Sequence, residues 1–108
     1  MRKIIQLEQF EREFSEFSKE SREDIFALID KYLNHEMLTP QCFKTFKIDK
    51  RTRIQEFKVK DHRGNWCAIS CHYEKDYLVL VYAFHKKSQQ LLDKDKEVIR
   101  NRIRRIDI

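Results

Sequence analysis

The 108-residue sequence is 41% hydrophobic and 38% charged, and its formal net charge is +5 at pH 7. The apolar share excludes a disordered chain, so we expect one compact domain over residues 1–108 with a highly charged surface. No apolar run approaches the roughly 20 residues of a membrane helix, and the start of the sequence lacks the apolar core of a signal peptide. We therefore expect a cytoplasmic protein that makes no contact with membranes.

Positive charge is concentrated in the second part of the chain. Residues 1–39 carry 6 basic and 9 acidic side chains, whereas residues 40–108 carry 17 basic and 9 acidic ones. Clustered lysine and arginine side chains bind phosphates with release of counterions, which favours a nucleic acid, a ribosome or an acidic protein as the partner. A solvated basic face with no ligand explains the charge alone equally well.

Two helices are predicted near the N-terminus. A short strand at residues 4–7 precedes them, and the spacing of Phe10, Phe14 and Phe17 places these rings on one helical face that packs in the core. Ser21 is the expected N-cap of the second helix, which has an apolar face of its own. We expect the two helices to pack together as a hairpin.

A three-strand antiparallel meander follows a basic connection over residues 41–53. The expected strands, separated by turn residues, cover residues 55–60, 66–74 and 77–86. Both alternating sets of the third strand are largely apolar, which predicts a strand that is covered on both faces and central in the sheet. The final segment, from about residue 93 to 106, predicts a basic amphipathic helix. The expected fold class is therefore α+β.

The cysteines indicate free thiols rather than a disulfide framework. Cys42, Cys67 and Cys71 are an odd number, and we expect a reducing compartment, so these thiols should be unpaired and mostly buried. Cys71 and His72 are neighbours on a strand and point to opposite faces, which is poor geometry for a metal site. We expect no metal and no other cofactor.

The segment at residues 83–90, Ala-Phe-His-Lys-Lys-Ser-Gln-Gln, precedes the charged helix. It resembles the Phe-x-Lys-Lys-Thr/Ser-Gln stretch of the HigB-like, phage-derived branch of the RelE/ParE superfamily of type II toxin–antitoxin toxins. The resemblance covers residues 54 to about 104, and residues 1–53 match only in the order of their elements. It implies a RelE-like fold, in which an N-terminal helical hairpin packs on a small, twisted, antiparallel-rich sheet with a C-terminal basic helix. It also implies a metal-independent, ribosome-dependent mRNA endoribonuclease that inhibits translation and is held inactive by a cognate antitoxin protein.

A candidate site follows from the chemistry of RNA cleavage without a metal. Such a site must help to deprotonate the 2′-hydroxyl, neutralise the phosphate and protonate the leaving oxygen. Lys58 and Lys60 share one face of their strand, and we expect antiparallel pairing to bring His72 near them. His72 could transfer protons near neutral pH, whereas His62 and His85 are weaker candidates. The candidate catalytic residues are Lys58, Lys60, His72 and Lys86.

Five further residues are expected to hold the RNA around this site. Trp66 could stack on a base, and the others offer cations to phosphates. The set comprises Arg51, Arg53, Arg63, Trp66 and Lys87. If Lys58 and Lys86 are exposed phosphate contacts, replacing both with Ala should remove activity and leave folding unchanged. The alternative explanation of Lys58 and Lys60 is a strand face kept soluble by charge.

The sequence departs from the family pattern at the start of the middle strand. Members often carry Arg there, whereas this chain has Trp66, Cys67 and Ala68. The missing cation leaves two other toxin functions open: a homologue that occupies the ribosome without cutting, or a gyrase-directed relative of the ParE branch. A basic nucleic-acid-binding module with no toxin role is a third alternative.

Overall fold

The computed structural model describes residues 3–106, and their fold class is α+β, as predicted. The elements, in chain order, are β1 (Lys3–Gln6), α1 (Glu8–Phe14), α2 (Lys19–Leu33), β2 (Phe43–Lys47), β3 (Arg53–Asp61), β4 (Gly64–Tyr73), β5 (Tyr77–Lys86) and α3 (Asp93–Arg104). No helix in this part of the chain is long and apolar enough to cross a membrane.

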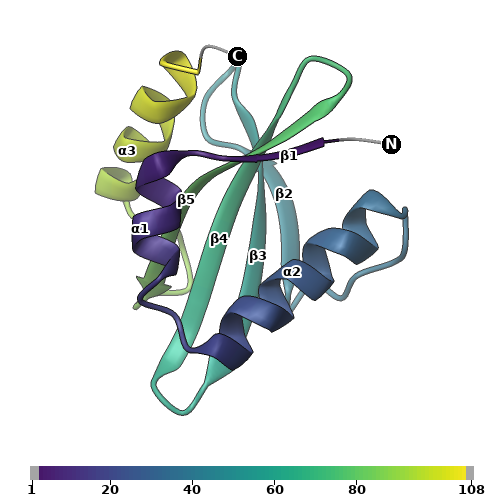
Figure 1. The fold of residues 1–108 in the computed structure, drawn as a ribbon. Helices are drawn as coiled ribbons and strands as arrows, with labels where there is room; N and C mark the ends of the chain where they lie inside the picture. Colours follow the sequence, from purple (N-terminus) through teal and green to yellow (C-terminus); the bar gives the residue numbers. More distant parts are fainter. Residues whose placement is uncertain (1–2, 107–108) are drawn as a thin grey trace.

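All five strands form one sheet in the order β1-β5-β4-β3-β2 (Figure 1). Strands β2 to β5 pair antiparallel, which confirms the predicted meander of β3, β4 and β5. Strand β1 pairs parallel to the first part of β5, through residues 3–6 and 77–80. The apolar strand β5 therefore lies inside the sheet, as predicted, although the middle position belongs to β4. The basic connection contributes β2, which is an edge strand.

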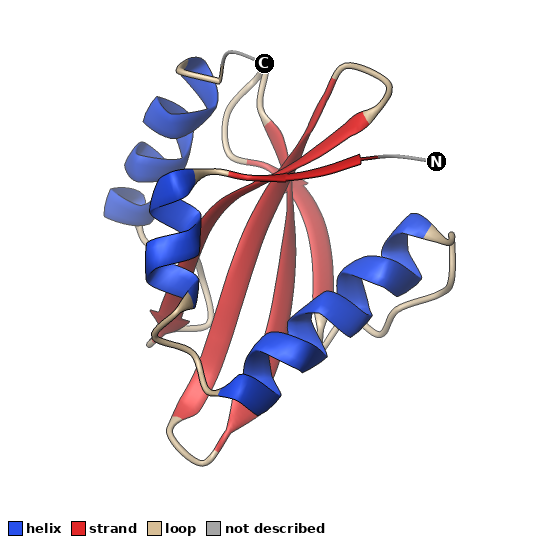
Figure 2. Ribbon diagram, viewed as in Figure 1, coloured by secondary structure: helices blue, strands red, loops and turns tan. Residues whose placement is uncertain are grey.

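Helices cover both faces of the sheet. Figure 2 shows α1 and α2 crossing in front of the strands, and the core beneath them includes the fully buried Phe10 and Ile25. A second apolar cluster, beneath α3, includes Ile69 and Ile99. Ala68 belongs to the first cluster and its neighbour Ile69 to the second, so the two clusters lie on opposite faces of the sheet.

Helix α2 begins earlier than predicted, because Ser18 and not Ser21 is its N-cap. The Ser18 backbone is extended, and its hydroxyl accepts a hydrogen bond from the Ser21 N–H at 3.1 Å. Ser21 lies in the first helical turn with only 2% of its surface exposed. The prediction of Ser21 was wrong because two serines three residues apart can each cap a helix, and packing of Ser21 against the core decides between them.

Helices α1 and α2 do not lie side by side as the expected hairpin would. They diverge from the short connection between Phe14 and Lys19 (Figure 1). Helix α1 packs mainly on β5, whereas α2 packs mainly on β3. The helices meet at their connection, where the rings of Phe14 and Phe26 pack edge to face with centroids 5.5 Å apart. Each helix therefore buries its apolar face against the sheet.

An ion pair joins α1 to α3 around the edge of β5. Strand β1 pairs with β5 only as far as Leu80, and Glu13 and Arg102 occupy the edge beyond it. The Glu13 carboxylate accepts a hydrogen bond from the Ala83 N–H at 3.2 Å, and Arg102 Nη1 donates to the Val81 carbonyl at 2.9 Å. The two side chains also bind each other at 2.7 and 2.8 Å. Side chains thus bond backbone groups that a further strand would otherwise pair with.

Candidate functional site

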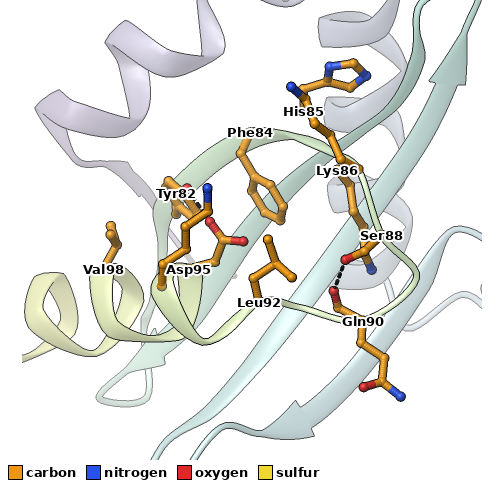
Figure 3. A pocket seen from close by; sticks show the side chains of 11 residues that line it. Tyr82, Phe84, His85, Lys86, Ser88, Gln90, Leu92, Asp95 and Val98 are labelled. Atoms are coloured by element: carbon orange, nitrogen blue, oxygen red, sulfur yellow. Dashed lines mark hydrogen bonds between the residues drawn. The ribbon is translucent and has the colours of Figure 1, made fainter.

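Three adjoining pockets form a groove where β5 ends, on the face of the sheet that carries α3. Their volumes are about 290, 450 and 510 Å³, and Lys86 lines all three. Residues 87–90, the second half of the motif, contribute to each pocket. Figure 3 shows the first pocket, in which the Ser88 hydroxyl donates a hydrogen bond to the Gln90 carbonyl. The segment that carries the resemblance therefore lines a concave surface.

A buried ion pair forms the floor of the groove. Lys86 Nζ lies 2.9 and 3.1 Å from the two carboxylate oxygens of Glu56. The two side chains are only 5% and 3% exposed. They come from β5 and β3 and meet across β4, next to Cys67, whose pKa is raised to about 12 by burial and by the nearby Glu56 carboxylate. Lys86 is therefore a neutralised, structural cation and not the exposed phosphate contact that was expected.

Five other lysines supply the positive charge of the groove. Lys58 projects from β3 on the face of Glu56, because residues two apart on a strand share a face. Within the described chain these lysines form no ion pair, and four of them lie outside β3. The five are Lys44, Lys58, Lys87, Lys94 and Lys96. Amide and hydroxyl groups of Asn65, Ser88, Gln89 and Gln90 line the groove beside them.

His72 does not join these lysines. Lys58 pairs with Cys67 in the sheet, so Lys58 shares a face with the odd-numbered residues of β4 in this region and His72 points to the other face. There the imidazole Nε2 lies 2.7 Å from the hydroxyl of Tyr32 on α2. The expectation that antiparallel pairing brings Lys58 and His72 together is wrong, because directly paired residues lie on the same side of a sheet. The same alternation separates His72 from Cys71, as predicted.

Trp66 is enclosed rather than open to a base. Its surface is only 8% exposed. The His85 ring stacks on it at 4.4 Å, the Phe17 ring packs at 5.0 Å, and the Arg63 guanidinium lies 4.6 Å from its centroid. The indole N–H donates to Asp61 at 2.9 Å. Burial acts to raise the pKa of Asp61, but this hydrogen bond and the nearby Arg63 help to hold that pKa below its ordinary value. Trp66 and Arg63 thus stabilise the β3–β4 hairpin.

The remaining predicted RNA-binding residues lie in different places. Lys87 lines the groove. Lys60 is exposed on the same face as Lys58, closer to the hairpin turn. Arg51 lines a separate pocket at the β2–β3 turn, and Arg53 is exposed at the start of β3. The structure therefore brings Lys58 and Lys87 to one groove and separates the two arginines from it.

Lys44 and Asn65 are among the groove residues that were not predicted as part of the site. Lys44 belongs to the basic connection and lies two residues before Phe46 on β2, so the two side chains share a face. Because Phe46 packs against the apolar cluster beneath α3, this spacing could have placed Lys44 on the α3 face. Asn65 is paired with Lys86 in the sheet, which no local pattern predicts. Both were missed because they face the site only after β2 and β4 have paired with their neighbours.

The groove can bind a phosphate but offers little for proton transfer. Its two carboxylates are engaged, since Glu56 pairs with Lys86 and Asp95 accepts a hydrogen bond from Tyr82 at 2.8 Å. That bond and burial raise the pKa of Tyr82, with burial the larger cause. His85 lines the first pocket, but one face of its ring is covered by the stack on Trp66. The described residues contain no cluster of three or more side chains suited to a metal.

Comparison with protein families gives one match that covers most of the chain. Residues 12–104 match the family described as phage derived protein Gp49-like (DUF891). Comparison with curated proteins gives no match. The matched stretch begins in α1 and ends with α3, so it contains every residue of the groove. The chain therefore belongs to the Gp49-like family of phage-derived proteins, within the RelE/ParE-like toxin superfamily.

Proposed function

We propose that this protein is the toxin of a type II toxin–antitoxin pair and inhibits translation by cutting mRNA on the ribosome, as the HigB-like branch does. The observation that carries this proposal is the groove at the end of β5. It combines the family motif with five lysines that form no ion pair in the described chain. Amide and hydroxyl donors beside cations suit the backbone of a nucleic acid, whose interfaces are polar and positively charged.

The proposed reaction needs no metal. The 2′-hydroxyl of the RNA gives its proton to water and attacks the adjacent phosphate, which gains negative charge in the transition state. The P–O5′ bond then breaks to leave a 2′,3′-cyclic phosphate, and the departing 5′-oxygen takes up a proton from water. Lys44, Lys58 and Lys87 would stabilise that charge from three sides of the groove. Lys86 and Glu56 act as positioning residues, because their ion pair holds the end of β5 and thereby the loop that carries Lys87. An antitoxin protein would keep this basic surface from RNA while the toxin is inactive.

A second candidate function is a toxin that occupies the ribosome or its mRNA without cutting. One observation favours it: the groove-lining carboxylates are both engaged, and the His85 ring is stacked on Trp66. This candidate keeps the RNA-binding role of the lysines but assigns them no proton transfer. The two functions therefore differ in the appearance of new mRNA ends, and not in RNA affinity.

Induced expression tests both candidates, with growth and mRNA 5′ ends followed together. Lys44→Ala and Lys58→Ala remove groove cations, and Lys75→Ala is the matched control in the exposed β4–β5 turn. We expect new 5′ ends with the parent and the control. Loss of one stabilising donor should slow cleavage by about a hundredfold. Growth arrest without new ends would select the non-cleaving function, and normal growth with a folded parent protein would overturn both.

A further inference from the structure

A second basic pocket lies outside the groove, where the β2–β3 turn meets the last turn of α3. Its volume is about 540 Å³, and its lining comprises Asp49, Lys50, Arg51, Thr52 and Arg104. The only acidic residue of this lining is committed to the turn. The Asp49 carboxylate accepts hydrogen bonds from the backbone N–H groups of Arg51 and Thr52 at 2.9 and 2.8 Å. In the described structure, the three cations of the pocket form no ion pair.

A stripe of cations on α3 connects this second pocket to the groove. Lys96, Arg100 and Arg104 recur every four residues and therefore lie along one side of the helix. Lys96 lines the groove and Arg104 lines the second pocket. At 1.5 Å per residue, the two ends of the stripe are about 12 Å apart along the helix. Arg100 lies between them, and its charge reaches the carboxylate of Asp49.

We propose that an RNA strand bound in the groove continues along α3, and that Lys50, Arg51 and Arg104 hold its phosphates at the far end. The inference rests on the proposed RNA-directed function and extends it to a second binding site. All five residues that line the second pocket carry polar or charged groups, and none is aromatic, whereas aromatic side chains are enriched at the centres of protein interfaces. A favourable interaction with the helix dipole would account for Arg104 but not for the two cations on the β2–β3 turn.

The test measures the salt dependence of binding to two fluorescent single-stranded RNAs, one long enough only for the groove and one that also spans α3. Arg51→Gln/Arg104→Gln removes two cations from the second pocket. Arg12→Gln/Lys31→Gln makes the same charge change on the exposed surface of α1 and α2. Circular dichroism and melting verify that both double variants are folded.

Each phosphate contact on a single strand contributes about 0.7 to the slope of log affinity against log salt. We expect the Arg51→Gln/Arg104→Gln variant to lose about 1.4 of that slope on the long RNA. Its slope on the short RNA should equal that of the parent, and the control should match the parent on both. An unchanged slope on the long RNA would overturn the inference while leaving the groove intact. If that result came with weaker antitoxin binding, the pocket would belong to the protein partner. Failure of the parent to bind either RNA would overturn the proposed function itself.

Discussion

Replacing Lys86 should strongly destabilise the protein, so a loss of activity in such a variant would not by itself show a role in RNA binding. The Lys86 ammonium and the Glu56 carboxylate are almost fully buried and bind each other through two contacts. Lys86→Met would leave the carboxylate buried without its partner, which costs about 3–5 kcal/mol. Domains of this size are stable by about 5–15 kcal/mol, so the loss is a large fraction of the total. The melting temperature should fall by more than about 10 °C.

A double-mutant cycle measures this interaction by urea unfolding. Lys86→Met and Glu56→Met are each expected to be strongly destabilising, whereas the double variant should recover most of the loss because no buried charge remains. Lys58→Met is the matched control, since Lys58 forms no ion pair in the described chain, and its cost should stay within about 0.5 kcal/mol. If Lys86→Met unfolds within about 1 kcal/mol of the parent, the ion pair does not hold the end of β5 and the reasoning is wrong.

Three further predictions concern thiols, acid stability and the β3–β4 hairpin. Burial raises the pKa of Cys67 to about 12 and of Cys71 to about 11. At pH 8 a thiol reagent should therefore label only Cys42 in the native protein and all three cysteines in urea. Rapid labelling of all three thiols in the native protein would contradict the buried positions of Cys67 and Cys71. Folding lowers the pKa of Asp61, so the stabilisation that its carboxylate provides is present above about pH 4 and is lost as the pH falls. The difference in urea midpoint between the parent and Asp61→Asn should therefore disappear on acidification. A difference that stays constant with pH would refute this role of the Asp61 carboxylate. Gly64 has φ +126°, and a Cβ there would lie 2.7 Å from His85 Nε2. Gly64→Ala should therefore lower the free energy of unfolding by about 1–3 kcal/mol and, by displacing the His85 ring from Trp66, change the tryptophan fluorescence. Unchanged fluorescence would show that the stack of His85 on Trp66 is not disturbed.

The predictable part of the fold was the meander, because its strands alternate and its turns carry turn residues. The sequence also indicated the first strand but not its parallel partner, since pairing of β1 with β5 joins segments more than 70 residues apart. The start of α2 was misplaced for a local reason: Ser18 and Ser21 have equal capping chemistry, and only the packed core decides between them.

The sequence motif of the candidate site could be predicted, but the side of the sheet on which each predicted residue lies could not. Lys58 and Lys87 reach the groove because one alternates with core residues and the other lies in the motif. His72 was assigned to the wrong side of the sheet because both faces of β4 carry small or apolar residues. The sequence of β4 alone therefore does not show which of its two faces lies on the same side of the sheet as Lys58. The burial of Lys86 depends on Glu56, which lies 30 residues away and carries no signal of its own.

The ion pair between Glu13 and Arg102 has a consequence for synthesis of the chain. These residues are 89 positions apart, and β1 likewise finds its strand partner only in β5. The first helix and strand therefore leave the ribosome long before the segments that hold them in place exist. Contacts of such sequence separation form late and slow the folding of small domains. The groove should consequently take shape only after α3 has been made, so an unfinished chain would lack the complete basic surface on which the proposed function depends.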